Sequence, residues 1–132
     1  MQVIGLDHLV LTVRSIPATV AFYERVLGMR AITFGAGRTA LVFGPHKINL
    51  HQADNMFDPK AVAPTMGSGD LCFLVDSLDG AEAHLAVCGV PMLVARSTRA
   101  GARGALTSIY IRDPDENLIE LSVYQDGTKA AA

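Results

Sequence analysis

The sequence contains no tryptophan and only two cysteines among its 132 residues. Cys72 and Cys88 stand in apolar surroundings and form no CxxC pair, so the chain carries no recognisable redox or cysteine-based zinc motif. Two such cysteines also fall short of the disulfide framework that small secreted domains use. We therefore expect both side chains to be buried, reduced thiols in a cytoplasmic protein.

Long apolar runs and an excess of one charge are missing as well. No apolar run reaches the roughly 20 residues of a membrane-spanning helix, and the N-terminus lacks the basic start and apolar block of a signal peptide. With 11 basic and 13 acidic residues the net charge is −2, so we expect neither nucleic acid nor a membrane as a partner. The apolar content of 50% is enough for one compact domain of this length.

An internal repeat organises the chain. The stretch HLVLTVRSI at residues 8–16 matches DLCFLVDSL at residues 70–78, and in both copies an apolar strand pattern leads into a helix pattern. Three extended segments follow each helix, so each copy is predicted to form a βαβββ module. We expect a single α+β domain at residues 1–132, with one module at about 3–54, a linker at 55–68 and a second module at about 69–125.

Capping residues mark the ends of the two predicted helices. A side-chain oxygen at the first position satisfies free backbone N–H groups, and a glycine at the end adopts the left-handed conformation that stops a helix. The residues in these positions are Ser15 and Gly28 in the first copy, and Ser77 or Asp79 and Gly89 in the second.

Polar residues occupy equivalent strand positions in the two copies. His8 and Asp70 begin the first strands, while Asn49 and Glu120 lie in the middle of the last strands, with His51 one pleat beyond Asn49. Two similar sheets side by side would bring these side chains to one concave surface. Imidazole nitrogens and carboxylates are ligands for divalent metals, so we predict a metal site formed by His8, His51, Asp70 and Glu120.

Two stretches resemble the vicinal oxygen chelate superfamily, which includes glyoxalase I, bleomycin-resistance proteins and extradiol dioxygenases. They are LDHLVLTVRSIPATVAFYERVLGM and YIRDPDENLIEL, and the likeness extends over residues 4–124. The second stretch departs from the usual D-P-D-G-N-x-x-E pattern because Glu116 replaces glycine. The resemblance implies two modules forming a curved mixed sheet, a metal in the cleft between them, and a homodimer.

The resemblance also implies roles for single residues. His8 and Glu120 fall on ligand positions, whereas Asp70 stands where bacterial glyoxalase I has a histidine and Asn49 stands where it has a glutamate. Whether Asn49 or His51 supplies the ligand from the first module stays open, as does formation of the cleft within one chain or across a dimer. The metal is expected to be Ni, Co, Zn, Mn or Fe.

The chemistry expected at this site is glyoxalase-like. Glu120 would serve as ligand and base, and Tyr110 would lie opposite it if the last two strands pair as a hairpin. Arg38 and Arg103 are candidates for binding an anionic substrate. We expect a metal-dependent lyase or isomerase acting on a small molecule. The alternatives are an extradiol-type dioxygenase and a metal-free protein that sequesters its ligand.

Overall fold

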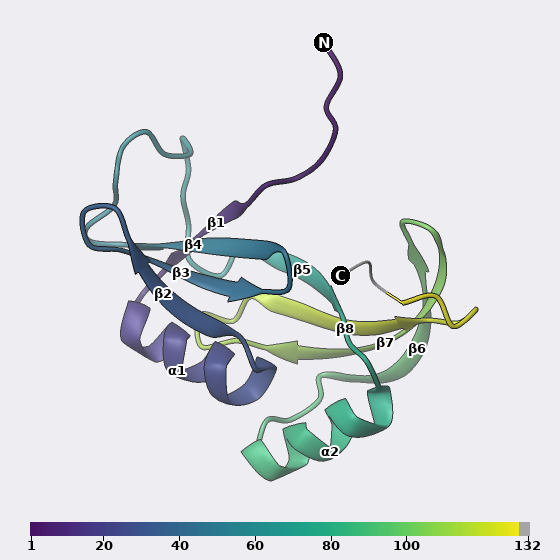
Figure 1. Ribbon diagram of the computed structural model, residues 1–132. Helices are drawn as coiled ribbons and strands as arrows, with labels where there is room; N and C mark the ends of the chain where they lie inside the picture. Colours follow the sequence, from purple (N-terminus) through teal and green to yellow (C-terminus); the bar gives the residue numbers. More distant parts are fainter. Residues whose placement is uncertain (130–132) are drawn as a thin grey trace. The chain divides into compact units, whose positions relative to one another are not determined.

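The computed structural model describes residues 1–129, which form two compact units that divide between Gly67 and Ser68 (Figure 1). Each unit contains one four-stranded mixed sheet and one helix. The βαβββ plan predicted from the repeat is therefore confirmed in both halves of the chain. The joining of the two sheets into one curved sheet, and the exact division into modules and linker, stay predictions.

The first unit has strand order β1-β4-β3-β2. Strand β1 pairs in parallel with β4, and the other neighbours are antiparallel. The elements are β1 (Leu9–Val13), α1 (Ile16–Leu27), β2 (Arg30–Phe34), β3 (Arg38–Phe43) and β4 (His46–Gln52).

The second unit repeats this topology with strand order β5-β8-β7-β6, and β5 pairs in parallel with β8. The elements are β5 (Asp70–Leu74), α2 (Leu78–Cys88), β6 (Val94–Gly101), β7 (Gly104–Arg112) and β8 (Leu118–Tyr124). The register repeats too, since Val10 pairs with Asn49 in the first unit and Cys72 pairs with Glu120 in the second.

Both helices begin and end where the capping residues predicted. The Ser15 hydroxyl accepts a hydrogen bond from the backbone of Ala18 at 3.2 Å, and Gly28 ends α1 with φ 66°. Ser77, rather than Asp79, caps α2, and Gly89 ends it with φ 70°. An L-residue would be strained at either glycine.

Alternation along the last strand of each unit separates an apolar core from a polar face. In β4, Ile48 and Leu50 are almost completely buried in the core, and in β8 Ile119 and Leu121 are buried likewise. The residues between them point to the opposite face of the sheet, because side chains alternate along a strand. That opposite face carries the candidate site residues of each unit.

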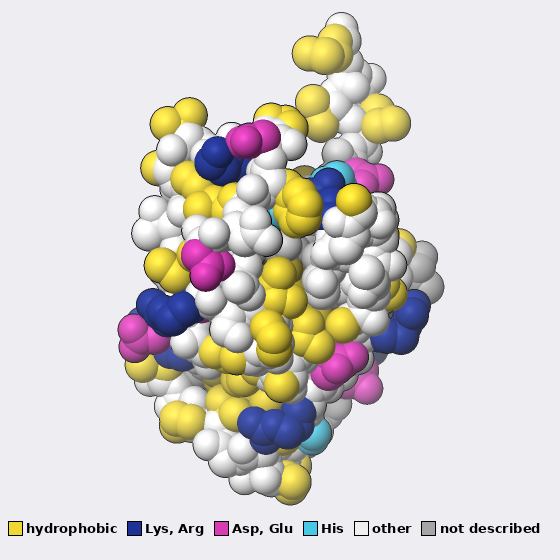
Figure 2. Space-filling model, turned by 90° about the vertical axis from the view of Figure 1, so that its left-hand side faces the viewer, with side chains coloured by type: hydrophobic (Ala, Val, Ile, Leu, Met, Phe, Trp, Pro, Cys, Tyr) yellow, Lys and Arg dark blue, Asp and Glu magenta, His cyan; other side chains and the backbone are white. Residues whose placement is uncertain are grey.

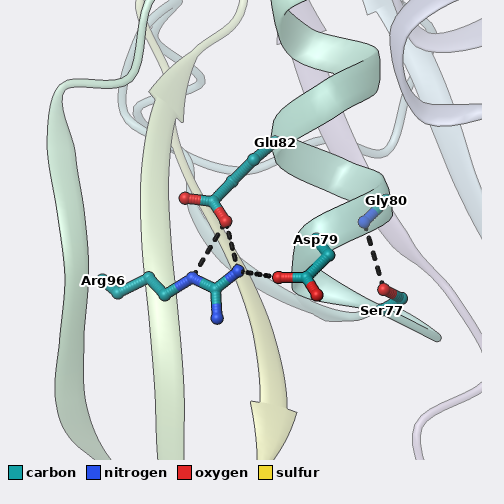
Figure 3. Close-up of polar contacts among 5 residues, drawn as sticks. All are labelled: Ser77, Asp79, Gly80, Glu82 and Arg96. Carbon is teal, nitrogen blue, oxygen red and sulfur yellow. Dashed lines mark hydrogen bonds and ion pairs between the residues drawn. The ribbon is translucent and has the colours of Figure 1, made fainter.

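Helix α2 is also attached to its sheet by an ion-pair cluster (Figure 3). The Arg96 guanidinium, from β6, donates hydrogen bonds to the carboxylates of Asp79 and Glu82 on the helix. Beside this cluster, the Ser77 hydroxyl accepts from the backbone N–H of Gly80 at 3.1 Å. The helix itself is rich in alanine, so these contacts supplement a small apolar interface.

The two cysteines differ from the sequence prediction. Cys72 is exposed and Cys88 is only half-buried, although both are free thiols, so the prediction of buried cysteines was wrong. Cys72 is exposed because it lies on the polar face of the edge strand β5. Arg103 lies in the tight turn between β6 and β7.

The first strand begins at Leu9, directly after His8. Residues 1–8 are exposed, and Figure 2 shows hydrophobic side chains on this N-terminal segment. Within residues 1–129, none of the helices is long and apolar enough to cross a membrane.

Candidate functional site

The polar face of the second unit centres on Glu120. The Ser108 hydroxyl donates to Glu120 Oε2 at 2.6 Å, and the Tyr110 hydroxyl donates to Oε1 at 2.9 Å. Ser122 lies 3.1 Å from the same Oε2 and 2.7 Å from the Ser108 oxygen, while the Cys72 thiol lies 3.2 Å from Ser122. The Glu120 carboxylate is therefore the last group in a hydrogen-bonded series that runs from the Cys72 thiol through Ser122 and Ser108.

Hydrogen bonds favour the charged form of this carboxyl group. Burial alone would raise the pKa of Glu120, but the hydroxyls of Ser108, Tyr110 and Ser122 outweigh burial and lower it. Burial and the bond to Glu120 in turn raise the pKa of Tyr110, and partial burial of the thiol raises the pKa of Cys72, although the residue as a whole is exposed. At neutral pH Glu120 is an anion surrounded by protonated donors.

Strand pairing explains why these groups meet. In the β7–β8 register Tyr110 lies opposite Glu120, as predicted, and Ser108 lies opposite Ser122. The Arg99 guanidinium, from β6, lies 5.2 Å from the centre of the Tyr110 ring. Ser108 and Ser122 are fully buried, so the sheet itself shields their hydrogen bonds with Glu120 from water.

The turn before β8 fixes the position of Glu120 in the sheet. The Asp113 carboxylate accepts from the backbone of Asp115 and from both the backbone and side chain of Asn117, at 2.8–2.9 Å. The Asn117 side-chain oxygen then accepts from the backbone N–H of Gly69 at 2.7 Å, just before β5. The D-P-D-x-N stretch is thus a structural clamp that sets the β5–β8 register.

The polar face of the first unit centres on His51, which is 3% exposed. Arg38 Nη2 lies 3.4 Å from His51 Nε2, and the Phe57 ring packs against the imidazole at 5.9 Å between ring centres. Because a guanidinium only donates, Nε2 is the acceptor and the ring is neutral. Burial, followed by the charges of Arg38 and Lys60, lowers the pKa of His51.

Asn49 is the other buried polar residue on this strand face. It is 4% exposed, and its Oδ1 has no hydrogen-bond partner among residues 1–129. An unsatisfied buried amide oxygen costs roughly 1–3 kcal/mol. The free oxygen is therefore available to a ligand.

The two predicted ligands at strand starts lie at the edges of their sheets. His8 stands just before β1, and its Nδ1 lies 2.7 Å from Asp7 Oδ1. A carboxylate on one ring nitrogen is the arrangement that orients metal-binding histidines, with Nε2 left for the metal. Asp70 is the exposed first residue of β5, one pleat from Cys72.

The two predicted substrate-binding arginines have different surroundings. Arg38 contacts the imidazole of His51 and the rings of Phe34 and Phe57 in the first unit. Arg103 stacks at 5.2 Å over Tyr124, at the far end of β8 from the Glu120 cluster. The substrate-binding role of either residue remains a prediction.

The side chains present offer the chemical types of donor atom that bind divalent metals. Glu120 Oε1 accepts one hydrogen bond and retains a lone pair, His51 is neutral, and Asn49 offers a free amide oxygen. Within residues 1–129 the structure assembles no group of three His, Cys, Asp or Glu residues into a metal site. The predicted ligand set of His8, His51, Asp70 and Glu120 thus remains a prediction.

Sequence reasoning missed several members of the two clusters. Ser108 and Phe57 carry no motif, and their contacts depend on strand register and on the path of a loop. Asp7 could have been recognised from the sequence, because it directly precedes His8 in the LDHLVLTV stretch.

These modules, each with a polar face on its last strand, define a protein of glyoxalase-like fold. Residues 5–121 match the model of the Glyoxalase/Bleomycin resistance protein/Dioxygenase superfamily, and the chain belongs to this family. The glyoxalase domain-containing protein RDO1 of Mycosarcoma maydis is 51% identical over 127 residues, which are 96% of this chain and 72% of that protein. The crystal structure of virulence protein STM3117 from Salmonella typhimurium is 49% identical with a TM-score of 0.92, covering 94% of this chain and 99% of that one.

More distant solved structures share the fold. Lactoylglutathione lyase from Agrobacterium tumefaciens has a TM-score of 0.67 at 21% identity, covering 89% of this chain and 92% of its own. The fosfomycin resistance protein FosX from Listeria monocytogenes, in complex with Mn(II) and sulfate, has a TM-score of 0.65 at 21% identity, covering 94% and 93%.

Proposed function

We propose that this protein is a metal-dependent enzyme of glyoxalase type, a lyase or isomerase that stabilises an enediolate or other oxyanion of a small oxygenated substrate. The observation that carries the proposal is Glu120, an ionised carboxylate held on a sheet face by three hydroxyl groups. The family membership and the fold shared with lactoylglutathione lyase support it.

The residues proposed to hold the metal are His8, Asp70, Glu120 and one residue of β4. The two candidates on β4 are His51, whose Nε2 would first have to leave Arg38, and Asn49, whose Oδ1 has no partner among residues 1–129. Asp7 orients His8 for this role. A bound divalent ion would supply Lewis-acid stabilisation of substrate oxygens.

Proton transfer is assigned to Glu120. Its Oε1 would take a proton from the substrate carbon next to a carbonyl, and return it at the neighbouring carbon in an isomerisation. The hydrogen bonds that lower the pKa of Glu120 also weaken it as a base. If the Tyr110 hydroxyl turns from Oε1 to a substrate oxygen on binding, Glu120 loses one of the hydrogen bonds that lower its pKa and becomes a stronger base.

A second candidate function is metal-free ligand binding. The observation in its favour is that both Glu120 oxygens are already satisfied by protein hydroxyls. In that case the polar faces would bind a small molecule without chemistry, as a sequestering protein does.

The two candidates differ in metal content. Protein purified without a metal-chelating column should contain close to one equivalent of a divalent metal by elemental analysis. After stripping, Ni, Co, Mn, Zn and Fe(II) are added back singly and assayed for hemithioacetal isomerisation and for catechol ring opening. Ring opening with Fe(II) alone would indicate the dioxygenase alternative, and absence of bound metal with no activity would support sequestration.

The proposal also includes a cytoplasmic location, a homodimer, and a small-molecule substrate with no nucleic acid or membrane partner. The balanced charge and the family resemblance support these points. Light scattering at tens of micromolar protein tests the dimer, and a monomeric mass would contradict it.

A further inference from the structure

The first unit carries a cation without an acidic partner. We call Phe34, Arg38, Asn49, His51 and Phe57 the Arg38 cluster. The contacts of Arg38 are His51 Nε2 at 3.4 Å and the rings of Phe34 and Phe57, whose centres lie 5.2 Å and 5.1 Å from the guanidinium carbon. Among residues 1–129, no carboxylate pairs with Arg38.

The surroundings of Arg38 hold its side chain in place and leave its donors available. Two aromatic rings and a neutral imidazole contact the guanidinium, and only Nη2 is engaged in a hydrogen bond. A guanidinium has five N–H donors in a planar fork that matches a carboxylate or phosphate group. The remaining donors of Arg38 are therefore positioned to receive an oxyanion.

Other charges near the cluster have the sign that favours an anion. Lys47 lies on the same strand face as Asn49 and His51, and its Nζ is 3.6 Å from the centre of the Phe34 ring. Lys60, by contrast, is paired with Asp58 at 2.7 Å. The positive charge near the cluster thus comes from Arg38 and from Lys47, whose charge also helps to lower the pKa of the exposed Asp7 carboxyl group.

Asn49 gives an independent indication of a ligand. Its side chain is more than nine-tenths buried, and its unpartnered Oδ1 lies on the same strand face as His51, two residues away along β4. Positions two residues apart on a strand are separated by about 7 Å. A small ligand that contacts Arg38 can therefore donate a hydrogen bond to Asn49 Oδ1.

We propose that the Arg38 cluster is an oxyanion subsite, which binds the carboxylate or phosphate-type head group of a small anionic substrate through Arg38 and accepts a hydrogen bond from a neighbouring substrate hydroxyl through Asn49 Oδ1. The inference rests on the proposed function in naming the ligand a substrate. His51 acts as a positioning residue that holds the guanidinium.

The test uses the full chain, stripped of metal and kept in EDTA, with amide chemical shifts followed by NMR at constant ionic strength. Sodium phosphate, acetate and glycolate are titrated separately. We expect saturable shifts at residues 38, 49, 51 and 57 with phosphate, with the carboxylates, or with both, and the effective ligands identify the head group. Arg38→Met should weaken binding about tenfold or more, and Arg38→Lys should weaken it less, because the charge remains but the fork is lost.

Two controls separate this subsite from general charge effects and from the proposed enzyme. Arg25→Met removes an exposed cation on α1 and should leave binding within about twofold of the original. Glu120→Gln should also leave anion binding unchanged, even where it abolishes metal binding. If glycolate binds more tightly than acetate, Asn49→Leu should remove that preference.

Absence of saturable shifts with all three anions, or equal binding by the original chain and Arg38→Met, would overturn the subsite. Such a result would leave the proposed function standing, because metal content is measured separately. If the original chain binds these anions but binds no metal, the proposed function is contradicted and the subsite stands.

Discussion

Neutral hydroxyl groups stabilise the charged form of Glu120. Ser108 and Tyr110 each donate to one carboxylate oxygen, and the buried position of Ser108 shields its bond from water. Hydrogen bonds to a charged group contribute roughly 1.5–3 kcal/mol each. The state of this carboxyl group therefore depends on residues that carry no charge of their own.

Ser108→Ala should lower the free energy of unfolding at neutral pH by about 1.5–3 kcal/mol. The folded pKa of Glu120 lies below its ordinary value of 4.5, so its stabilising contribution is present above that pH and is lost as the pH falls through the folded pKa. The cost of Ser108→Ala should consequently be smaller at pH 3 than at pH 7. Urea unfolding at both pH values measures this difference.

Ser97→Ala is the matched control for that experiment. Ser97 pairs with Ser108 in the β6–β7 register, but its buried hydroxyl has no hydrogen-bond partner among residues 1–129. Its removal should be neutral or slightly stabilising at both pH values. A similar pH-dependent loss in both variants would contradict the role given to Ser108.

Some of this residue-scale detail could be predicted from the sequence. Glu120 interrupts an apolar alternation, and hairpin pairing predicted Tyr110 opposite it. Ser108 could not be identified, because it lies opposite Ser122 and reaches Glu120 diagonally across the strand pair, which depends on side-chain geometry. Arg38 was predicted to bind an anion, but its contacts with His51 and Phe57 depend on the path of a loop.

At the scale of elements, the β7–β8 turn contains a conformational strain. Glu116 has φ 67°, a left-handed conformation that suits glycine and costs other L-residues roughly 1–2 kcal/mol. Glu116 replaces the glycine of the usual pattern, and its backbone nevertheless keeps the left-handed conformation that a glycine would permit.

Glu116→Gly should raise the free energy of unfolding by about 1 kcal/mol, since the strain falls while the unfolded chain gains some freedom. Chemical denaturation measures the change. Glu116→Ala removes the same side chain without relieving the backbone, and should gain less than about 0.5 kcal/mol. Equal gains from the two variants would show that the side chain, and not the backbone, is responsible.

Asn117→Ala should destabilise the second unit by about 2–3 kcal/mol, because it removes the side-chain hydrogen bond to Asp113 Oδ2 and leaves the Gly69 N–H without its acceptor. Amide shifts should change in both β5 and β8, which this side chain connects. Asn55→Ala, an exposed asparagine outside the clamp, should change stability by no more than about 0.5 kcal/mol. A small effect of Asn117→Ala, comparable to that of the control, would refute the clamp.

The elements were predicted well where capping and alternation agree, and poorly elsewhere. Ser15, Gly28 and Gly89 located the helix ends. The segment around Arg103 contains glycine and alanine, which favour a loop, yet pairing between β6 and β7 overrides that preference. Tertiary pairing of this kind has no local signature.

At the scale of the whole molecule, the repeat is the feature that sequence and structure share most fully. Both units have the same strand order, and equivalent residues pair in β1–β4 and in β5–β8. The polar residues nevertheless differ between the units. One unit has an arginine and imidazole cluster and the other a carboxylate and hydroxyl cluster, which suits the division between substrate anion and proton transfer proposed here.

The central claim is that Glu120 is a metal ligand and base, and thermal melting of Glu120→Gln with and without EDTA tests it most directly. The original chain should melt at a lower temperature in EDTA, whereas the variant should retain its fold, bind little metal and melt alike in both conditions. Glu116→Gln, which removes the same charge at an exposed turn, should keep the response to EDTA. If the original chain contains no metal and its melting ignores both the chelator and the mutation, the metal-dependent enzyme is contradicted.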